Sequence, residues 1–242
     1  MSFNSVSFAA FLPVVFMLYW IIPKKYQWVV LLISSYYFYM SWNVKYVFLI
    51  FLTTAVSYCS GILLERTASS SGRKVILLCT VTVCLGILFL FKYFNLFSNI
   101  FCSFLGLFAI QLHPVTVNLL LPVGISFYTF QTLSYVADVY LGRISAEKHL
   151  GRYAVYISFF PQLVAGPIER TGNLLPQIKS GKQFRYEDAV YGLRQMLWGF
   201  YKKVVIADTL SYYVDKVYNA PYTWGGGYLF NCSILLFFSN LL

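Results

Sequence analysis

The sequence predicts an all-α integral membrane protein, built as a bundle of several helices with some segments broken or re-entrant. Of its 242 residues, 59% are hydrophobic and 11% are charged, whereas soluble domains are about 25% charged. A second observation is that apolar runs long enough to cross a bilayer recur along the chain. They lie near 6–23, 26–42, 46–64, 75–91 and 119–141. The third observation is a stripe of polar side chains within the last of these runs, which predicts a polar interior.

Basic residues between the first runs indicate the orientation of the chain. Lys24 and Lys25 follow the first run, and the segment 65–74 carries three more basic residues. Cytoplasmic loops are enriched in lysine and arginine, so both positions are expected inside and the N-terminus outside. The first run has no secretory cleavage pattern and is expected to remain a membrane helix. The net charge of +10 is spread over such loops, which favours lipid headgroups as partners and excludes nucleic acid.

A weaker apolar segment, 94–111, contains several asparagines and serines. If it crossed the membrane, the basic loop 142–152 would lie outside, against the charge bias of cytoplasmic loops. We therefore expect 94–111 to lie in the interface, or to dip into the membrane and return.

The run 119–141 carries its polar residues on one helical face, at alternating steps of four and three. These residues are Gly124, Tyr128, Gln131, Tyr135 and Asp138. Lipid tails cannot satisfy amide, phenol and carboxylate groups, so this face is predicted to contact protein or a water-filled cavity. Two alternatives stay open for the amide, which can join two helices or bind a substrate. The carboxylate either lies deep in the membrane or reaches the interface beside Arg143.

The segment 153–168 is short and is interrupted by Pro161 and by the Gly166-Pro167 pair. A full crossing would place the basic residues that follow it outside, which favours a broken or re-entrant segment buried in protein. An ordinary span with a proline kink is the open alternative. Arg170, just after the break, is suited to bind a phosphate or carboxylate, or alternatively a lipid phosphate. The polar stretch from Glu169 to Asp188 is predicted to be a loop.

The last part of the chain contains two further segments. Residues 189–206 form an apolar stripe at helical spacing, which predicts an amphipathic helix in the cytoplasmic headgroup region. The final apolar run, 226–242, has no charged anchor after it. We expect one membrane domain over 1–242 that is an N-terminal fragment of a longer domain.

No pattern of catalytic or metal-binding residues is present in the sequence. His113 and His149 lie in expected loops without a nucleophile motif, and the five cysteines lie in apolar runs without a zinc-site spacing. We therefore predict no metal and no bound cofactor.

Two blocks, LPVGISFYTFQTLSYVADVYLG (121–142) and YISFFPQLVAGPIER (156–170), followed by LLPQI (174–178), resemble the membrane-bound O-acyltransferase (MBOAT) family. Within that family they are most similar to the bacterial alginate O-acetylation branch. The resemblance covers essentially the whole chain but only the N-terminal half of such a protein. It implies a multi-helix bundle with a passage through it. The family's catalytic histidine lies beyond Leu242, so no catalytic residue carries over and the fragment is expected to be inactive alone.

The resemblance also implies the reaction and its setting. An acetyl or acyl group passes from a cytoplasmic donor, acetyl-CoA or an acyl carrier, to hydroxyls of an extracytoplasmic polysaccharide such as alginate. The expected location is the bacterial inner membrane, with many spans and with extracytoplasmic acetyltransferase proteins as partners. Alternatives are teichoic acid or peptidoglycan as acceptor, and a non-enzymatic membrane conduit or assembly subunit. The motif positions expected to line the passage are Gln131, Asp138, Gln162, Gly166, Pro167 and Arg170.

Overall fold

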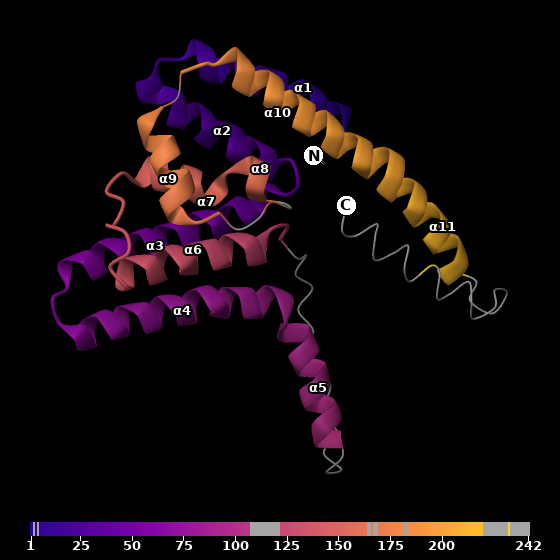
Figure 1. Cartoon of the computed structure of the whole chain (residues 1–242). Helices are drawn as coiled ribbons and strands as arrows, with labels where there is room; N and C mark the ends of the chain where they lie inside the picture. The colour runs from indigo at the N-terminus through magenta and orange to yellow at the C-terminus, as the bar shows by residue number, and fades with distance from the viewer. Residues whose placement is uncertain are drawn as a thin grey trace. The chain divides into compact units, whose positions relative to one another are not determined.

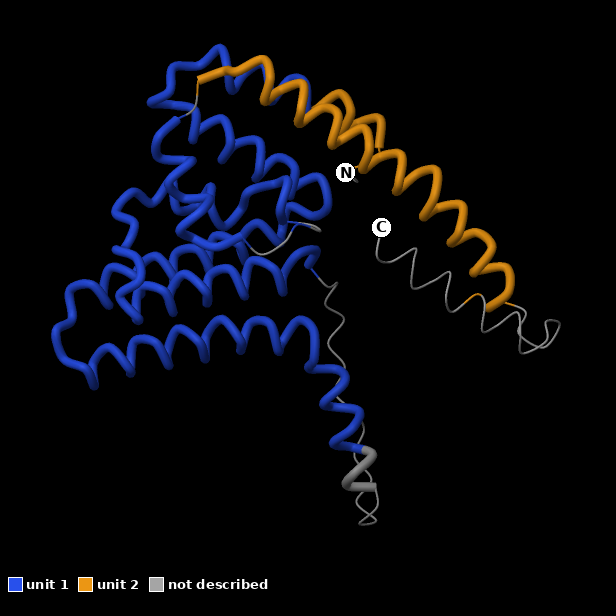
Figure 2. Tube along the Cα trace, in the orientation of Figure 1, with its two compact units in different colours: residues 1, 12–182 blue, residues 2–11, 183–242 orange. Residues whose placement is uncertain are grey.

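The computed structural model describes residues 1, 3, 5–106, 122–163, 166, 169–181, 183–219 and 232, and the side chains of 103–106 are not among them. Every regular element in these ranges is a helix. The chain divides into two compact units, shown in blue and orange in Figure 2. Unit 1 comprises Met1 and Leu12–Lys182, and unit 2 comprises Ser2–Phe11 and Gln183–Leu242. The predicted all-α class is therefore confirmed for the described residues.

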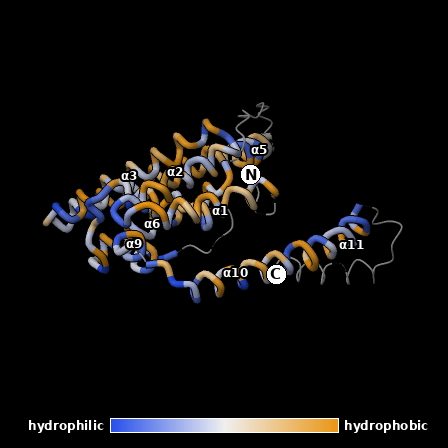
Figure 3. Tube along the Cα trace, turned by 90° about the horizontal axis from the view of Figure 1, so that it is seen from above, coloured by the Kyte–Doolittle hydropathy of each residue, from blue (hydrophilic) through white to orange (hydrophobic). Residues whose placement is uncertain are grey.

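Unit 1 contains the following helices, the first of which begins in unit 2: α1 (Val6–Ile21), η1 (Lys24–Tyr26), α2 (Gln27–Met40), η2 (Val44–Tyr46), α3 (Val47–Arg66), α4 (Ser70–Lys92), α5 (Phe94–Gly106), α6 (Ile125–Tyr140), α7 (Leu150–Ser158), α8 (Phe160–Leu163) and α9 (Thr171–Ser180). Two helical stretches, Val44–Arg66 and Ser70–Lys92, are long and apolar enough to cross a membrane. Coloured by hydropathy, apolar residues recur along α1, α2 and α3 (Figure 3).

Helices α3, α4 and α6 contact one another and lie side by side in Figure 1. Small residues allow this close packing. A Cβ atom on Gly61 of α3 would lie 2.6 Å from the hydroxyl oxygen of Tyr135 in α6. At the far end, Arg73 of α4 donates from Nη2 to the carbonyl oxygen of Tyr140, at 2.6 Å. This cation stabilises the C-terminal end of α6, where helix carbonyls lack partners.

Helices α2, α7, α8 and α9 form a second group in this unit, with α7 contacting α2, α3 and α9. The side chain of Tyr153 in α7 is fully buried, and its hydroxyl donates to Ser57 Oγ of α3 at 2.7 Å. Helix α7 ends at Ser158, and Phe159 leaves the helical region with ψ 108°. Pro161 then sits at the second position of α8, where the missing N–H removes no helix bond. The predicted break in 153–168 is thus confirmed.

The prediction of a loop from Glu169 to Asp188 was wrong, because Thr171–Ser180 forms α9 and a further helix begins at Tyr186. The apolar residues Leu174, Leu175 and Ile178 recur at helical spacing and pack on the core cluster of the unit. The polar residues between them gave the segment the composition of a loop. Gly181, with φ 55°, follows the last residue of α9.

Unit 2 contains α10 (Tyr186–Phe200), a π-helical stretch η3 (Tyr201–Ala207) and α11 (Asp208–Tyr218). Helix in the predicted segment 189–206 is confirmed, and it extends beyond that segment at both ends. No residue of α10 is buried, and Leu193, Leu197 and Trp198 are more than half exposed. Apolar and polar residues alternate along these helices (Figure 3).

Some predictions fall partly or wholly outside the described residues. The segment 94–111 is helical over α5, but 107–111 is not described. His113 and the segment 226–242, apart from Cys232, also lie outside the described residues. The location of 94–111 and of 189–206 in the membrane interface stays a prediction.

Candidate functional site

The polar stripe of α6 faces protein. Tyr128, Gln131 and Tyr135 are 0%, 3% and 0% exposed. Gln131 donates from Nε2 to the carbonyl oxygen of Tyr156 in α7 at 2.8 Å. The hydroxyl of Tyr135 accepts from the backbone N–H of Glu147 at 3.0 Å. The stripe therefore joins α6 to its neighbours, which is the commoner of the two uses weighed for a buried amide.

The two ends of the stripe differ from the expected helical face. Gly124 precedes the first helical residue and has a left-handed conformation, with φ 76°. A Cβ atom there would lie 2.4 Å from the carbonyl oxygen of Leu163, so the start of α6 packs directly on the end of α8. Asp138 lies near the other end of α6 and pairs with Arg143 at 3.3 Å. Its side chain is 18% exposed, so the carboxylate reaches the edge of the bundle.

The segment between α6 and α7 is fixed by a buried carboxylate. Glu147 is 3% exposed, and its Oε2 pairs with Nζ of Lys179 in α9 at 2.5 Å. Its Oε1 accepts from the N–H of His149 at 2.9 Å. Nδ1 of His149 in turn accepts from the N–H of Arg152 and caps the start of α7. This histidine, exposed as expected for a loop residue, thus has a structural role.

Three cavities of unit 1 adjoin one another around α9. We name the first the arginine cavity; its volume is about 570 Å³. It is lined by Ser134, Asp138, Arg143, Ile144, Arg170, Gly172 and Asn173. Gly172 and Asn173 also line the second, the amide cavity, which has a volume of about 610 Å³. The other residues of the amide cavity are Phe159, Pro161, Gln162, Gly166, Glu169, Leu174 and Gln177.

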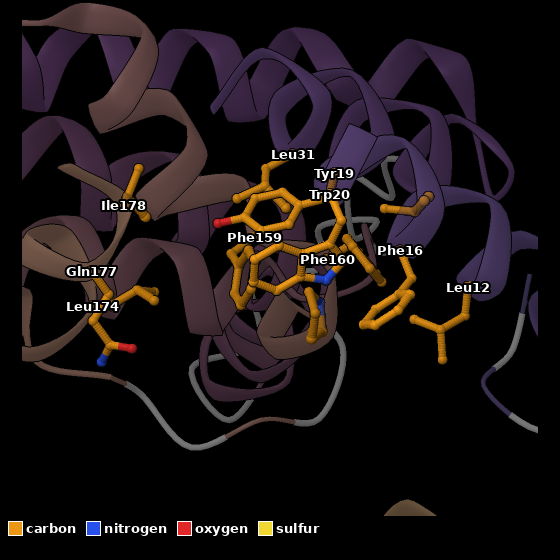
Figure 4. A pocket seen from close by; sticks show the side chains of 12 residues that line it. Leu12, Phe16, Tyr19, Trp20, Leu31, Phe159, Phe160, Leu174, Gln177 and Ile178 are labelled. Atoms are coloured by element: carbon orange, nitrogen blue, oxygen red, sulfur yellow. The ribbon is translucent and has the colours of Figure 1, made fainter. Parts of the chain in front are cut away.

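The third space, the apolar cavity, has a volume of about 310 Å³. It shares four lining residues with the amide cavity: Phe159, Pro161, Leu174 and Gln177. In Figure 4 the rings of Tyr19, Trp20 and Phe159 gather at its centre, with Leu174 and Gln177 on one side and Leu12 on the other. The arginine cavity is lined by charges of both signs, the amide cavity by amides and one carboxylate, and the apolar cavity mainly by aromatic and aliphatic side chains.

The cavities bring together four of the six residues expected to line a passage. Asp138 and Arg170 line the arginine cavity, while Gln162 and Gly166 line the amide cavity. Gln131 lines none of the three cavities, and Pro167 lies outside the described residues. Whether any of them borders a route across the membrane stays a prediction.

Sequence reasoning missed Asn173 and Gln177. They lie four residues apart in α9, and Gln177 donates from Nε2 to the carbonyl oxygen of Asn173 at 3.0 Å. A spacing of four residues places two side chains on one face of a helix. The sequence showed this spacing, but the segment had been predicted to be a loop. Among the described residues, no group of three histidine, cysteine, aspartate or glutamate side chains is arranged to hold a metal ion.

Comparison with known proteins supports the resemblance of the two sequence blocks. No protein-family model and no solved structure matches the chain. The chain is 34% identical over 218 residues to the probable alginate O-acetylase AlgI of Pseudomonas aeruginosa, covering 89% of this chain and 41% of that protein. It is 31% identical over 249 residues to the peptidoglycan O-acetyltransferase of Helicobacter pylori, covering 88% and 46%.

A shorter match, 29% identical over 105 residues, is to the teichoic acid D-alanyltransferase of Bacillus subtilis, covering 43% of this chain and 27% of that protein. In each of these three matches the chain covers less than half of the relative's length.

Proposed function

Because the chain belongs to the membrane-bound O-acyltransferase family, we propose that it is part of an enzyme that transfers an acetyl group to hydroxyls of a polysaccharide. Alginate is the first candidate for that polysaccharide. The observation that carries this proposal is the similarity to alginate O-acetylases over 89% of the chain at 34% identity. A second relative, from Azotobacter vinelandii, is 32% identical over 98% of the chain and is also a probable alginate O-acetylase AlgI.

The proposed reaction needs two substrates that start on opposite sides of the membrane. The donor is acetyl-CoA or an acyl carrier in the cytoplasm, and the acceptor is a polysaccharide outside. Transfer requires that the acceptor hydroxyl be deprotonated near the thioester carbon. A chain of this family therefore has to bring both substrates together within its membrane domain, and cavities between helices are the usual place for such binding.

The proposed location is the bacterial inner membrane, with several spans. Two helical stretches of unit 1 are long and apolar enough to cross, and the basic residues lie between apolar runs. Extracytoplasmic acetyltransferase proteins are proposed as partners on the family resemblance alone.

The test is complementation. The complete protein is produced in a strain that makes alginate but has lost its own O-acetylase, and the acetyl content of the secreted alginate is measured by NMR. We expect acetyl esters to return, while a strain with the empty vector stays unacetylated. Protein that is present in the membrane and leaves alginate, peptidoglycan and teichoic acid unmodified would refute the proposal.

Peptidoglycan is the second candidate acceptor. The observation that favours it is the 31% identity to a peptidoglycan O-acetyltransferase over 88% of the chain. Acetyl esters on the purified cell wall, with none on alginate, would select this acceptor.

A further inference from the structure

The apolar cavity is suited to hydrocarbon. Among the described residues, no charged side chain lines it. Its lining is aromatic and aliphatic apart from Gln177, whose Nε2 already donates to the carbonyl oxygen of Asn173 at 3.0 Å. Phe16 of α1 lines the cavity and is 46% exposed, so the cavity opens to the surroundings of the helices. Water finds too few partners in such a space, whereas in a membrane protein lipid chains are at hand to fill it.

The cavity is long and narrow. In Figure 4, Leu12 lies at one side and Ile178 at the other, with aromatic rings between them. Along α1, the stretch from Leu12 to Trp20 corresponds to about 12 Å, less than the roughly 15 Å of one leaflet. Over that length, a volume of about 310 Å³ gives a mean width of about 6 Å, whereas an α-helix is about 10–12 Å across. The cavity therefore fits one hydrocarbon chain and is too narrow for a helix.

The Ile178 end of the cavity lies beside the lysines of η1. A Cβ atom on Gly181, which follows α9, would lie 3.2 Å from Cβ of Lys24. At the start of α2, Gln27 donates from Nε2 to the carbonyl oxygen of Tyr19 at 3.2 Å. These two contacts hold η1 against the ends of α1 and α9, and both of these ends line the cavity.

The two lysines of η1 give this end of the cavity a positive charge. Lys24 and Lys25 are exposed, and neither forms an ion pair within the described part of the chain. The buried carboxylate that contacts α9, Glu147, already pairs with Lys179. Each lysine near a membrane surface raises the affinity for anionic lipid about fivefold. A zwitterionic headgroup contains its own cation, which these lysines would repel.

We propose that an anionic glycerophospholipid binds here, with one acyl chain in the apolar cavity and its phosphate beside Lys24 and Lys25. The charge bias that places these lysines inside assigns the lipid to the cytoplasmic leaflet. Tyr19 and Trp20, near the end of α1, suit the boundary between hydrocarbon and headgroups, where such rings are enriched. The lipid is a bound component that is not consumed, and its binding does not require the proposed acetyl transfer.

The test of the headgroup contact is native mass spectrometry of the complete protein, freed of lipid and then titrated. The probes are phosphatidylglycerol and phosphatidylcholine with identical acyl chains. The first lipid bound should be phosphatidylglycerol, with a preference of about tenfold. In Lys24→Gln/Lys25→Gln this preference should disappear while phosphatidylcholine binding stays unchanged. The matched control, Lys45→Gln/Lys92→Gln, changes two exposed lysines elsewhere in unit 1 and should keep the preference.

Leu12→Trp tests the acyl chain. An indole at the end of the cavity far from the lysines should weaken binding of both probes about three- to tenfold, because less of the chain is buried. The matched control is Leu78→Trp on α4, which is 64% exposed and lines no part of the cavity.

Photolabelling of the unmodified protein gives a second measurement that needs no variant to fold. Phosphatidylglycerol with a diazirine in one acyl chain should label residues within 12–20 and 159–178, which can be located by mass spectrometry of peptides.

Three outcomes would overturn the assignment. They are a preference for phosphatidylglycerol that persists in Lys24→Gln/Lys25→Gln, unchanged lipid binding in folded Leu12→Trp, and label confined to other segments. If a second copy of the chain or another protein excludes the label from 12–20, the cavity belongs to that partner and the proposal is likewise wrong.

Discussion

Helices α6 and α9 carry similar polar residues, but the two helices use them differently. Gln131 of α6 lies inside the bundle and is bonded to α7, whereas α9 presents Asn173 and Gln177 to open cavities. Beside α9, Gln162 is nearly as buried as Gln131, and yet its Oε1 has no hydrogen-bond partner in the described part of the chain. Burial of an amide in an apolar chain therefore does not by itself show that its hydrogen bonds are satisfied.

The largest effect should occur where the start of α6 meets the end of α8. Gly124→Ala would place a Cβ atom 2.4 Å from the carbonyl oxygen of Leu163 and force a side chain into a left-handed conformation. We expect a loss of about 3 kcal/mol or more in the free energy of unfolding, measured by thermal unfolding in detergent. Gly142 also has a positive φ, 71°, but a Cβ atom there meets nothing. Gly142→Ala should therefore cost clearly less, and equal losses at both positions would contradict the packing described.

The ion pair between Glu147 and Lys179 should have the next largest effect. Lys179→Met leaves a 3%-exposed carboxylate without its cation. Complete burial of both partners would make this cost about 3–5 kcal/mol, but the lysine side chain is 43% exposed. We expect about 2 kcal/mol, measured as a lowered unfolding midpoint in denaturant, and partial recovery when Glu147→Gln is added. A single variant as stable as the parent would show that the carboxylate is solvated.

Gln131→Leu tests the comparison most directly. It removes the donor to the carbonyl oxygen of Tyr156 and should lower the free energy of unfolding by about 1–2 kcal/mol. The same change at Gln162 is expected to stabilise the free protein, so the two glutamines should give opposite signs in one Tm measurement. Shifts of the same sign at both positions would remove the distinction between the two helices.

The smallest effect is expected at Gly172, in the first turn of α9. Gly172→Ala meets no atom within 4 Å and favours the helix, so it should stabilise the protein by about 0.5 kcal/mol. The measurement is the midpoint of thermal unfolding in detergent, and a lowered midpoint would contradict the open space described at this position.

The inward face of α6 was predictable because three- and four-residue steps along an uncharged run have one physical meaning. The break after Ser158 was predictable because Pro161 and Gly166 interrupt any helix there. The cavities were not predictable. The walls of the apolar cavity combine α1, α2, α8 and α9, and residues as distant in sequence as Trp20 and Leu174 line it together only through packing. Helix α9 was missed because the prediction used the composition of the segment, which is mostly polar. The helical spacing of Leu174, Leu175 and Ile178 was not considered.

The short length of α7 has a consequence for how the bundle can cross a bilayer. Nine residues of helix extend about 14 Å, less than half the roughly 30 Å of hydrocarbon. If the bundle spans the bilayer, α7 alone cannot cross it, so the longer helices α3 and α4 have to supply the full thickness.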